Sequence, residues 1–370
     1  MDREENERLT RVGPGTPMGA LLRRYWWPIW FSEQVHDGPV PVRLLAEDFI
    51  LFRQPDGRLG LLERQCAHRR ASLEFGRVEA DGIRCCYHGW KYDRAGQCID
   101  TPLEPEESTL KQGVKMKAYA VEEAGGLVFG YVGPQPAPVF PRYDLLFREA
   151  GLTVVGADED HCNWLQRAEN TVDQMHLAML HASVYPDLAF KRFRTEYDQS
   201  WYGARITVTI PDRKPKVDHF IFPSTNRYTQ ARKGEVPAQK LRMRVPTDDT
   251  KTTTFYANTY PSITDRGRLE TKGLERSERG KYERVEDGWW RLASHDQDRA
   301  AQEGQGLIAD RSTEYLATSD KGLVFYRRLL REAMRAVEEG RDPIGVRRGA
   351  GHDAVIDFDS SMEELESLSA

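Results

Sequence analysis

Cys66-Ala67-His68 and Cys85-Cys86-Tyr87-His88, separated by sixteen residues, are the two stretches of this sequence that decide its fold. Each stretch supplies one thiolate and one imidazole, and each is expected on a loop between short strands. Two such loops facing each other could hold one metal centre between four ligands. A structural zinc site with two cysteines and two histidines has the same ligand count, although zinc fingers usually separate the cysteine pair from the histidine pair.

The residues after the second stretch, Gly-Trp-Lys-Tyr-Asp at 89–93 and Gly-Gln-Cys-Ile-Asp-Thr-Pro at 96–102, complete a pattern that resembles the Rieske family. The resemblance implies a [2Fe–2S] cluster, whose two imidazole ligands raise its reduction potential above that of a four-cysteine cluster. The implied ligands are Cys66, His68, Cys85 and His88. Only Cys85 has the spacing that the family requires, so its neighbour Cys86 is predicted to be a packed residue and not a ligand.

Length and composition indicate a two-domain protein without a membrane span. The chain has 370 residues, of which 39% are hydrophobic and 30% charged, and it contains no apolar run of roughly 18 residues. Its net charge is −5, and its 53 basic and 58 acidic residues are interspersed, so no nucleic-acid partner is expected. Five cysteines and an acidic N-terminus fit a reducing compartment, and we expect a cytoplasmic protein.

The N-terminal part of the chain is predicted to form an all-β cluster domain. Residues 40–132 consist of short β-rich runs, including two that flank an Asp56-Gly57 turn signal. Four prolines at 133–142 cannot continue a strand ladder and mark the domain boundary. Residues 1–39 are expected to pack on the second domain.

The remainder, residues 133–350, is predicted as an α+β catalytic domain. Four β-rich runs between 205 and 260 predict an antiparallel sheet, and helix formers at 163–181 and 314–340 predict helices that can carry ligands. The overall fold class is therefore α+β. Residues 351–370 are predicted to form an acidic, solvated tail.

The predicted helix at 163–181 carries the pattern Asn-x-x-Asp-x-x-His-x-x-x-x-His, in which His176 and His181 could bind a second metal. At about 100° per residue, the two histidines would point roughly 140° apart on a straight helix. We therefore expect the helix to bend, bulge or end between them, as helices often do at functional sites. Taken alone the pattern is weak, because polar residues on helices are common on protein surfaces.

Beside the Rieske pattern, this segment resembles the aspartate-bridged di-histidine motif of the Rieske oxygenases. The resemblance implies that His176, His181 and a distant carboxylate bind Fe(II) and leave one face open for O₂ and substrate. The candidate carboxylates are Asp287, Asp296, Asp298, Glu303, Asp310, Glu314 and Asp320. We favour Asp298, because Gln297-Asp298 with Glu303 resembles a Gln-Asp-x-x-x-x-Glu stretch of the phthalate-dioxygenase-like branch. Asp296 is the second choice.

The resemblance also implies a role for Asp173. This carboxylate would lie between a cluster histidine and an iron histidine, across a subunit boundary of a head-to-tail homotrimer, and link the two centres. O₂ activation needs two electrons per turnover, which a reductase must resupply. The sequence has no dinucleotide fingerprint and no plant-type ferredoxin pattern, so we expect NAD(P)H, flavin and any ferredoxin centre to bind other polypeptides.

The resemblance covers nearly the whole chain and is strongest to the oxygenase components of phthalate dioxygenase and of vanillate-type and lignin-biaryl O-demethylases. It implies O-demethylation or monohydroxylation of an aromatic substrate, carboxylated or phenolic. Ring cis-dihydroxylation of a phthalate-like acid is the alternative, and a Rieske electron carrier without catalysis is a more distant one. Residues that could line a pocket but are expected in the core by default are Phe220, Phe222, Phe255, Tyr256 and Asn258.

Overall fold

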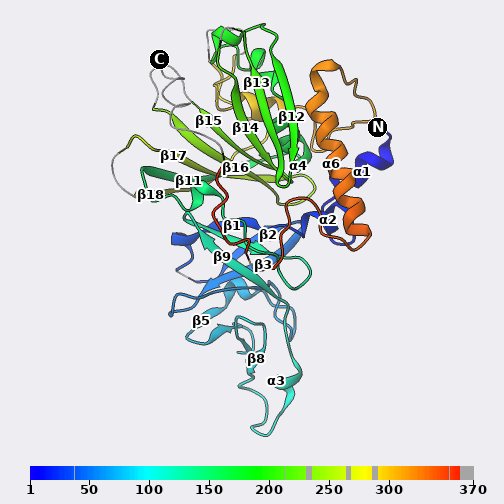
Figure 1. Cartoon of the computed structure of the whole chain (residues 1–370). Coiled ribbons are helices and arrows are strands. Elements are labelled where there is room, and N and C mark those ends of the chain that lie inside the picture. Colours follow the sequence, from blue (N-terminus) through cyan, green and yellow to red (C-terminus); the bar gives the residue numbers. More distant parts are fainter. Residues whose placement is uncertain are drawn as a thin grey trace.

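A computed structural model of the chain describes residues 1–36, 38–211, 213–230, 236–263, 268–285, 291–349 and 351–358 (Figure 1). Within these residues the strands form three sheets, of six, four and eight strands. The two smaller sheets come from the N-terminal part of the chain, and the eight-stranded sheet comes from residues 152–275 with helices around it. This arrangement confirms the predicted α+β class.

The six-stranded sheet is antiparallel throughout. In sheet order, its strands are β1 (Trp27–Phe31), β10 (Leu127–Tyr131), β9 (Ala118–Ala124), β4 (Leu59–Glu63), β3 (Glu47–Arg53) and β2 (Val40–Leu44). The predicted turn at Asp56-Gly57 joins β3 to β4, and Gly57 has a φ of 87°, a left-handed conformation that glycine adopts without strain. β1 lies before residue 40, the predicted start of the cluster domain, yet it belongs to this sheet.

The four-stranded sheet is small and lies at the lower end of the molecule in Figure 1. Its strands, in order, are β5 (Arg77–Glu79), β6 (Gly82–Arg84), β7 (Lys91–Tyr92) and β8 (Cys98–Asp100). It packs on β3 and β4 through a separate apolar core that contains Phe52, Leu62, Ile83 and Trp90. Because the sheet is so small, this core is what fixes the loops between its strands.

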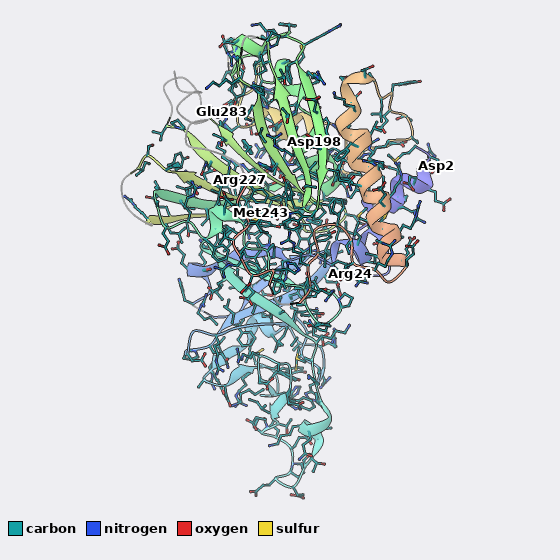
Figure 2. All side chains as sticks on the ribbon, viewed as in Figure 1. Asp2, Arg24, Asp198, Arg227, Met243 and Glu283 are labelled. Carbon is teal, nitrogen blue, oxygen red and sulfur yellow. The ribbon has the colours of Figure 1, made fainter. Side chains whose placement is uncertain are left out.

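The eight-stranded sheet is antiparallel except for one parallel pair, β11 with β18. In sheet order, the strands are β12 (Arg194–Ser200), β13 (Gly203–Thr209), β14 (Lys216–Ile221), β15 (Thr225–Gln230), β16 (Ala238–Pro246), β17 (Thr252–Tyr260), β11 (Leu152–Asp160) and β18 (Arg268–Glu275). One face shares the main core with the six-stranded sheet. Figure 2 shows Arg227 and Met243 in this central region, and both are buried.

The predicted helix at 163–181 is shorter than expected, since α4 spans only Trp164–Val172. Asp173 leaves the helical conformation, and its carboxylate accepts a hydrogen bond from the N–H of Met175 at 3.0 Å, which starts a short 3₁₀ turn at Met175–Ala178. The prediction that one helix would carry both histidines and bend, bulge or end between them was wrong, because α4 ends before both. A side chain that bonds its own backbone competes with helical hydrogen bonding, and Asp173 does so here.

The other helices are short, apart from one near the C-terminus. They are α1 (Arg3–Thr10), α2 (Pro17–Leu22), α3 (Leu110–Gly113), α5 (Gln297–Glu303) and α6 (Lys321–Glu338). The helix predicted at 314–340 begins only at Lys321 and ends at Glu338. None of the described helices combines the length and apolar character that a membrane span needs.

The N-terminal helices and the last described residues contact the body of the molecule. Helices α1 and α2 lie against α6, where Arg8 pairs with Glu338 at 3.0 Å. Residues 27–31 of the same predicted segment instead belong to the six-stranded sheet. The predicted tail differs from expectation at Ile356 and Phe358. The backbone N–H of Ile356 donates to the carbonyl of Arg142, and Phe358 is only 2% exposed, so the segment is anchored at these two residues. Residues 351–355 and Asp357 are exposed, as a solvated tail requires. Residues 359–370 lie outside the described residues.

A buried charge cluster ties α4 to α6. Glu169 on α4 is 8% exposed, and its carboxylate accepts hydrogen bonds from Arg311 at 2.8 Å and from Arg327 of α6 at 2.6 Å. Burial acts to raise the pKa of Glu169, but the two guanidinium groups outweigh it and hold the pKa below its usual value. The carboxylate is therefore ionised, and it supplies a counter-charge to both arginines.

Replacing Glu169 by Ala should lower the free energy of unfolding by about 3–5 kcal/mol, because it leaves buried guanidinium charge without its partner. Denaturant unfolding followed by circular dichroism measures the loss. The control Glu332→Ala removes an exposed pair with Arg328 on α6 and should change this free energy by less than about 0.5 kcal/mol. Equal unfolding midpoints for the two variants would contradict the proposed importance of Glu169.

Candidate metal sites

The two loops that carry the Cys and His pairs have the same backbone geometry. In each loop the cysteine N–H donates to the carbonyl of the fifth residue on, at 2.9 Å, and the cysteine carbonyl accepts from the fourth residue on, at 3.0 Å after Cys66 and 3.1 Å after Cys85. The fourth residue has a left-handed backbone in both, with φ 61° at Arg70 and 75° at Gly89. The repeated spacing of the sequence thus produces two equivalent loops that present one cysteine and one histidine each.

The four side chains of these loops converge. Cys66 and Cys85 are 1% and 3% exposed, and the rings of His68 and His88 lie 4.7 Å apart between centroids. Trp90 stacks on His68 at 4.4 Å with an interplanar angle of 4° and fixes the orientation of that ring. Nδ1 of His68 is buried and has no hydrogen-bond partner among the described residues, which fits a nitrogen reserved for a metal.

The electrostatics of this site suit thiolate and neutral imidazole ligands once a metal is present. Burial, together with the nearby Cys85, raises the pKa of the Cys66 thiol, so in the absence of a cation the thiolate is disfavoured. Desolvation and the neighbouring His68 lower the pKa of His88 and favour its neutral, ligating form. The hydroxyl of Tyr92 lies 3.2 Å from Sγ of Cys66, and burial raises its pKa, so it remains a donor to the sulfur.

Cys86 does not pack as the sequence predicted. Its side chain is exposed, whereas the adjacent Cys85 is buried. Residue 86 is the first residue of the turn that leads to His88. Its prediction as a packed residue was wrong, and its exposure gives no support to a ligand role.

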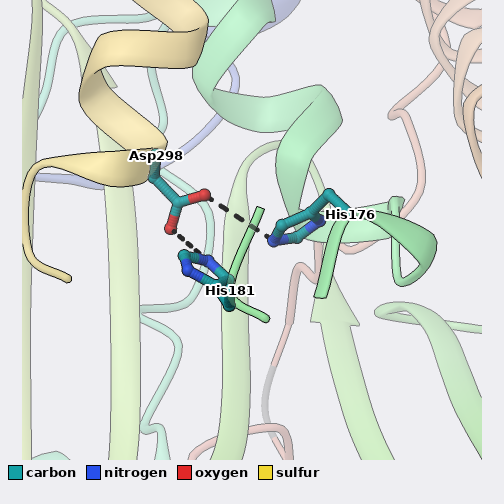
Figure 3. Close-up of side chains that lie close together, drawn as sticks. All are labelled: His176, His181 and Asp298. Atoms are coloured by element: carbon teal, nitrogen blue, oxygen red, sulfur yellow. Dashed lines mark ion pairs between the residues drawn. The ribbon is translucent and has the colours of Figure 1, made fainter. Parts of the chain in front are cut away.

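A second group of metal-binding side chains forms beside the eight-stranded sheet. Donor atoms of His176, His181 and Asp298 all lie within 4.8 Å of one another. Figure 3 shows the two carboxylate oxygens of Asp298 facing the two imidazoles, at 3.6 Å from Nε2 of His176 and 3.3 Å from Nε2 of His181. The three residues come from the segment after α4 and from the first turn of α5, 117 residues further along the chain at the nearest point (298 − 181).

Hydrogen bonds to the other ring nitrogens fix both imidazoles. Nδ1 of His176 donates to the backbone carbonyl of Asp173 at 2.6 Å, and Nδ1 of His181 donates to Oε1 of Gln297 at 2.8 Å. Both Nε2 atoms therefore face Asp298, the orientation that metal-bound histidines need. In the sequence, Gln297 stands out only as the residue before Asp298, and this adjacency is the signal that could have indicated its role in orienting His181.

Asp298 is charged in this environment. Burial acts to raise its pKa, but the hydrogen bond with His181 and the electrostatic influence of His176 and Arg167 outweigh it and hold the pKa well below its ordinary value. Asn170 of α4 also donates to Oδ1 of Asp298 at 3.1 Å. One carboxylate and two imidazole nitrogens on one side of a space form the facial ligand set typical of non-haem Fe(II), and the residues present fit that metal.

The other candidate carboxylates are engaged elsewhere. Asp296, the second choice, is 2% exposed and pairs with Arg299 while accepting from the N–H of Glu283 at 2.6 Å. The remaining described candidates have their own partners: Glu303 accepts from His161 and Tyr282, Asp310 from Ser312, Glu314 from Arg327, and Asp320 from Ala317. Asp287 lies outside the described residues. The structure thus brings only Asp298 of the described candidates to the two histidines.

Asp173 touches one of the two centres. Its Oδ2 lies 3.9 Å from Nδ1 of His176, and its side chain is 29% exposed. Among the described residues no contact joins it to His68 or His88, and Figure 1 shows the four-stranded sheet at the lower end of the molecule and α4 in the upper half. Within one chain, the two centres are therefore apart.

Comparison with known proteins agrees with both centres. Residues 25–119 match the Rieske [2Fe-2S] domain family. The chain is 34% identical to the 5,5'-dehydrodivanillate O-demethylase oxygenase subunit of Sphingobium sp., over 93% of this chain and 83% of that protein, and 30% identical to the phthalate 4,5-dioxygenase oxygenase subunit of Pseudomonas putida, over 98% and 92%. The chain belongs to the Rieske oxygenases, as an oxygenase subunit of a multicomponent system. Its cofactors are a Rieske [2Fe–2S] cluster and a mononuclear iron that uses O₂.

A solved structure supports the fold. NdmA of Pseudomonas putida CBB5 with caffeine superposes with a TM-score of 0.69 at 21% identity, over 92% of this chain and 98% of that one. At this identity the likeness concerns the fold alone. The predicted family, its fold and the two cofactors are thereby confirmed, while the assignment of individual ligands stays a prediction.

The adjacent cysteines offer a matched test of the cluster ligands. Cys85→Ala should abolish the visible absorption and the acid-labile sulfide of the purified protein, because a ligating thiolate is lost. Cys86→Ala removes an exposed thiol one residue away and should leave both unchanged. Loss of the cluster in the Cys86 variant, or its survival in the Cys85 variant, would contradict the assignment.

Proposed function

We propose that this chain uses O₂ and electrons from a separate reductase to O-demethylate or monohydroxylate an aromatic substrate, carboxylated or phenolic. The observation that carries the proposal is the meeting of His176, His181 and Asp298 within 4.8 Å, in the same chain as a Rieske domain. Two imidazoles and one carboxylate form a common Fe(II) site of oxygenases. A Rieske electron carrier would have no use for them, which disfavours that alternative.

The residues around the proposed iron site hold its ligands in place. Gln297 and the carbonyl of Asp173 keep the Nε2 atoms of both histidines directed inward, and Asp298 supplies the negative charge that favours a cation. When bound, the iron supplies the reduction of O₂ and the oxidation of the substrate, with electrons that pass through the Rieske cluster. Asp298 keeps 34% of its side chain exposed, so the ligand set is not sealed from the surrounding space.

Two relatives favour two kinds of reaction. Hydroxylation of a methoxy carbon gives a hemiacetal that breaks down to a phenol and formaldehyde, and the relative from Sphingobium is named an O-demethylase. Oxidation of the ring itself would give a diol, and the relative from Pseudomonas putida is named a phthalate dioxygenase. We take the first reaction as the leading proposal, and the assay described below separates it from the second.

We further propose that the chain works as a homotrimer in the cytoplasm and receives electrons from an NAD(P)H-dependent reductase on another polypeptide. Asp173 then joins His176 of one protomer to a cluster histidine of the next. Its partly exposed carboxylate, beside His176 and facing no cluster ligand of its own chain, supports this role. Five cysteines without a disulfide among the described residues fit a reducing compartment.

The catalytic proposal is tested with methoxylated and carboxylated aromatic compounds and a surrogate reductase, by measuring O₂ uptake together with formaldehyde. Formaldehyde in proportion to O₂ consumed is the expected result. Asp298→Ala should remove the mononuclear iron and the activity but leave the visible absorption of the cluster. Asp310→Ala, which alters an exposed carboxylate, is the control and should behave as the unaltered protein. Full activity of the Asp298 variant would refute the ligand assignment.

The linking role of Asp173 is tested by Asp173→Asn, which keeps an oxygen to accept from Met175 but removes the charge. Both iron centres should load normally, while reoxidation of the reduced cluster in a single turnover should slow by about 10- to 100-fold. Asp187→Asn, at an exposed carboxylate paired with Arg213, should reoxidise at the normal rate. An unchanged rate in the Asp173 variant would rule out the link.

A further inference from the structure

One face of the eight-stranded sheet is polar and only partly covered. Along β15 and β16, side chains on the other face are buried, whereas Asn226, Gln230, Lys240 and Arg242 on this face are partly exposed. Cross-strand pairing sets Asn226 beside Arg242, so these polar groups form one continuous surface. Arg244 follows Arg242 on the same side of β16. Three cationic side chains therefore lie in a row on this strand, those of Lys240, Arg242 and Arg244.

This polar face adjoins the proposed iron site. The ring of Tyr185 lies 6.5 Å from that of His181, and its hydroxyl accepts a hydrogen bond from Gln230 at 2.8 Å. Gln230 in turn accepts from Lys240. Helix α4, which leads into the histidine segment, packs against both β15 and β16. The row of Lys240, Arg242 and Arg244 therefore lies on the same side of the sheet as the metal ligands, and Tyr185 and Gln230 connect the two groups.

Arg244 is unlike the other fully buried arginines of the described chain. Three of the four hold a carboxylate: Arg227 that of Asp144 at 2.8 Å, Arg311 and Arg327 that of Glu169 at 2.8 and 2.6 Å. Arg244 is 6% exposed and has no carboxylate within 4.0 Å among the described residues. Its Nη1 donates to the neutral amide oxygen of Asn226 at 2.7 Å, and its Nε is buried with no hydrogen-bond partner in the part of the chain that the structure describes.

A buried guanidinium without a counter-charge is unfavourable unless an anion joins it. Burial, followed by repulsion from the cations Arg167 and Arg242, lowers the pKa of Arg244 to about 9, so the side chain is still charged at neutral pH. The charge of Asp298 also acts on Arg244, but that carboxylate already faces the two histidines. The cation is therefore available for a ligand that brings its own negative charge.

We propose that Arg244, with Arg242 beside it, binds the carboxylate of an aromatic acid and so holds the ring of the substrate at the iron site. Nη1 of Arg242 is also buried without a partner among the described residues, and its guanidinium is fixed over the ring of Tyr256 at 4.6 Å. Two neighbouring guanidinium groups can donate several charge-assisted hydrogen bonds to one carboxylate. This inference rests on the proposed function and narrows its substrate class from carboxylated or phenolic compounds to aromatic acids.

The test measures equilibrium binding of benzoate and of its neutral isostere benzamide to the iron-loaded protein, without reductase or NAD(P)H. Benzoate should bind the unaltered protein at least about 30-fold more tightly than benzamide, and Arg244→Met should lose this preference by weakening benzoate alone. Arg194→Met removes an exposed cation of the same sheet and should keep the preference.

Equal affinities of the unaltered protein for benzoate and benzamide would overturn the proposal, and this comparison needs no variant. A preference retained in Arg244→Met would overturn it as well. Because binding is measured without turnover, failure here is distinct from failure of the proposed function. Demethylation of neutral methoxyarenes without preference for benzoate would contradict only this inference, and tight benzoate binding without oxygenation would contradict only the proposed reaction.

Discussion

The structure depends on one constraint: two imidazoles and one carboxylate from distant parts of the chain must face one another within 4.8 Å. α4 brings the histidine segment to the sheet and is itself held by the buried charges of Glu169 and Arg327. α5 begins with Gln297 and Asp298, so one turn of helix supplies both a ligand and the group that orients His181. The C-terminal end of α4 and the N-terminal end of α5 thus position the metal ligands.

The cluster site could be predicted because its geometry is local. One cysteine and one histidine per loop, at spacings that a tight loop dictates, repeat in sequence and produce the same backbone hydrogen bonds around Cys66 and Cys85. Fold class followed from the order of β-rich and helical runs. The domain limits could not be predicted in this way. Strand β1 pairs with β10, which lies about 100 residues later in the chain, and no local sequence pattern specifies that partner.

The iron site could be predicted only in part. Nothing in the composition of 163–181 indicates a helix end, since no proline or glycine interrupts it; the end depends on a hydrogen bond from Met175 to Asp173. The choice of Asp298 over Asp296 came from family resemblance. The structure distinguishes the two carboxylates because Asp296 forms an ion pair with Arg299. From the sequence alone, either aspartate could have formed that pair. The sequence alone could not predict that Arg244 is buried without a carboxylate partner among the described residues, because this depends on which side chains surround each buried arginine.

The segment that carries His176 and His181 has a consequence for the unloaded protein. Most of its backbone hydrogen bonds, such as those from Leu180 to His176 and from Tyr185 to His181, span no more than four residues, and a longer one joins Phe190 to Ala178. Among the described residues, the segment belongs to no strand and no long helix. A bound cation would connect this segment to α5, and the free energy of metal binding would stabilise the segment against local unfolding. Loss of iron would therefore loosen this segment before the sheets that support it.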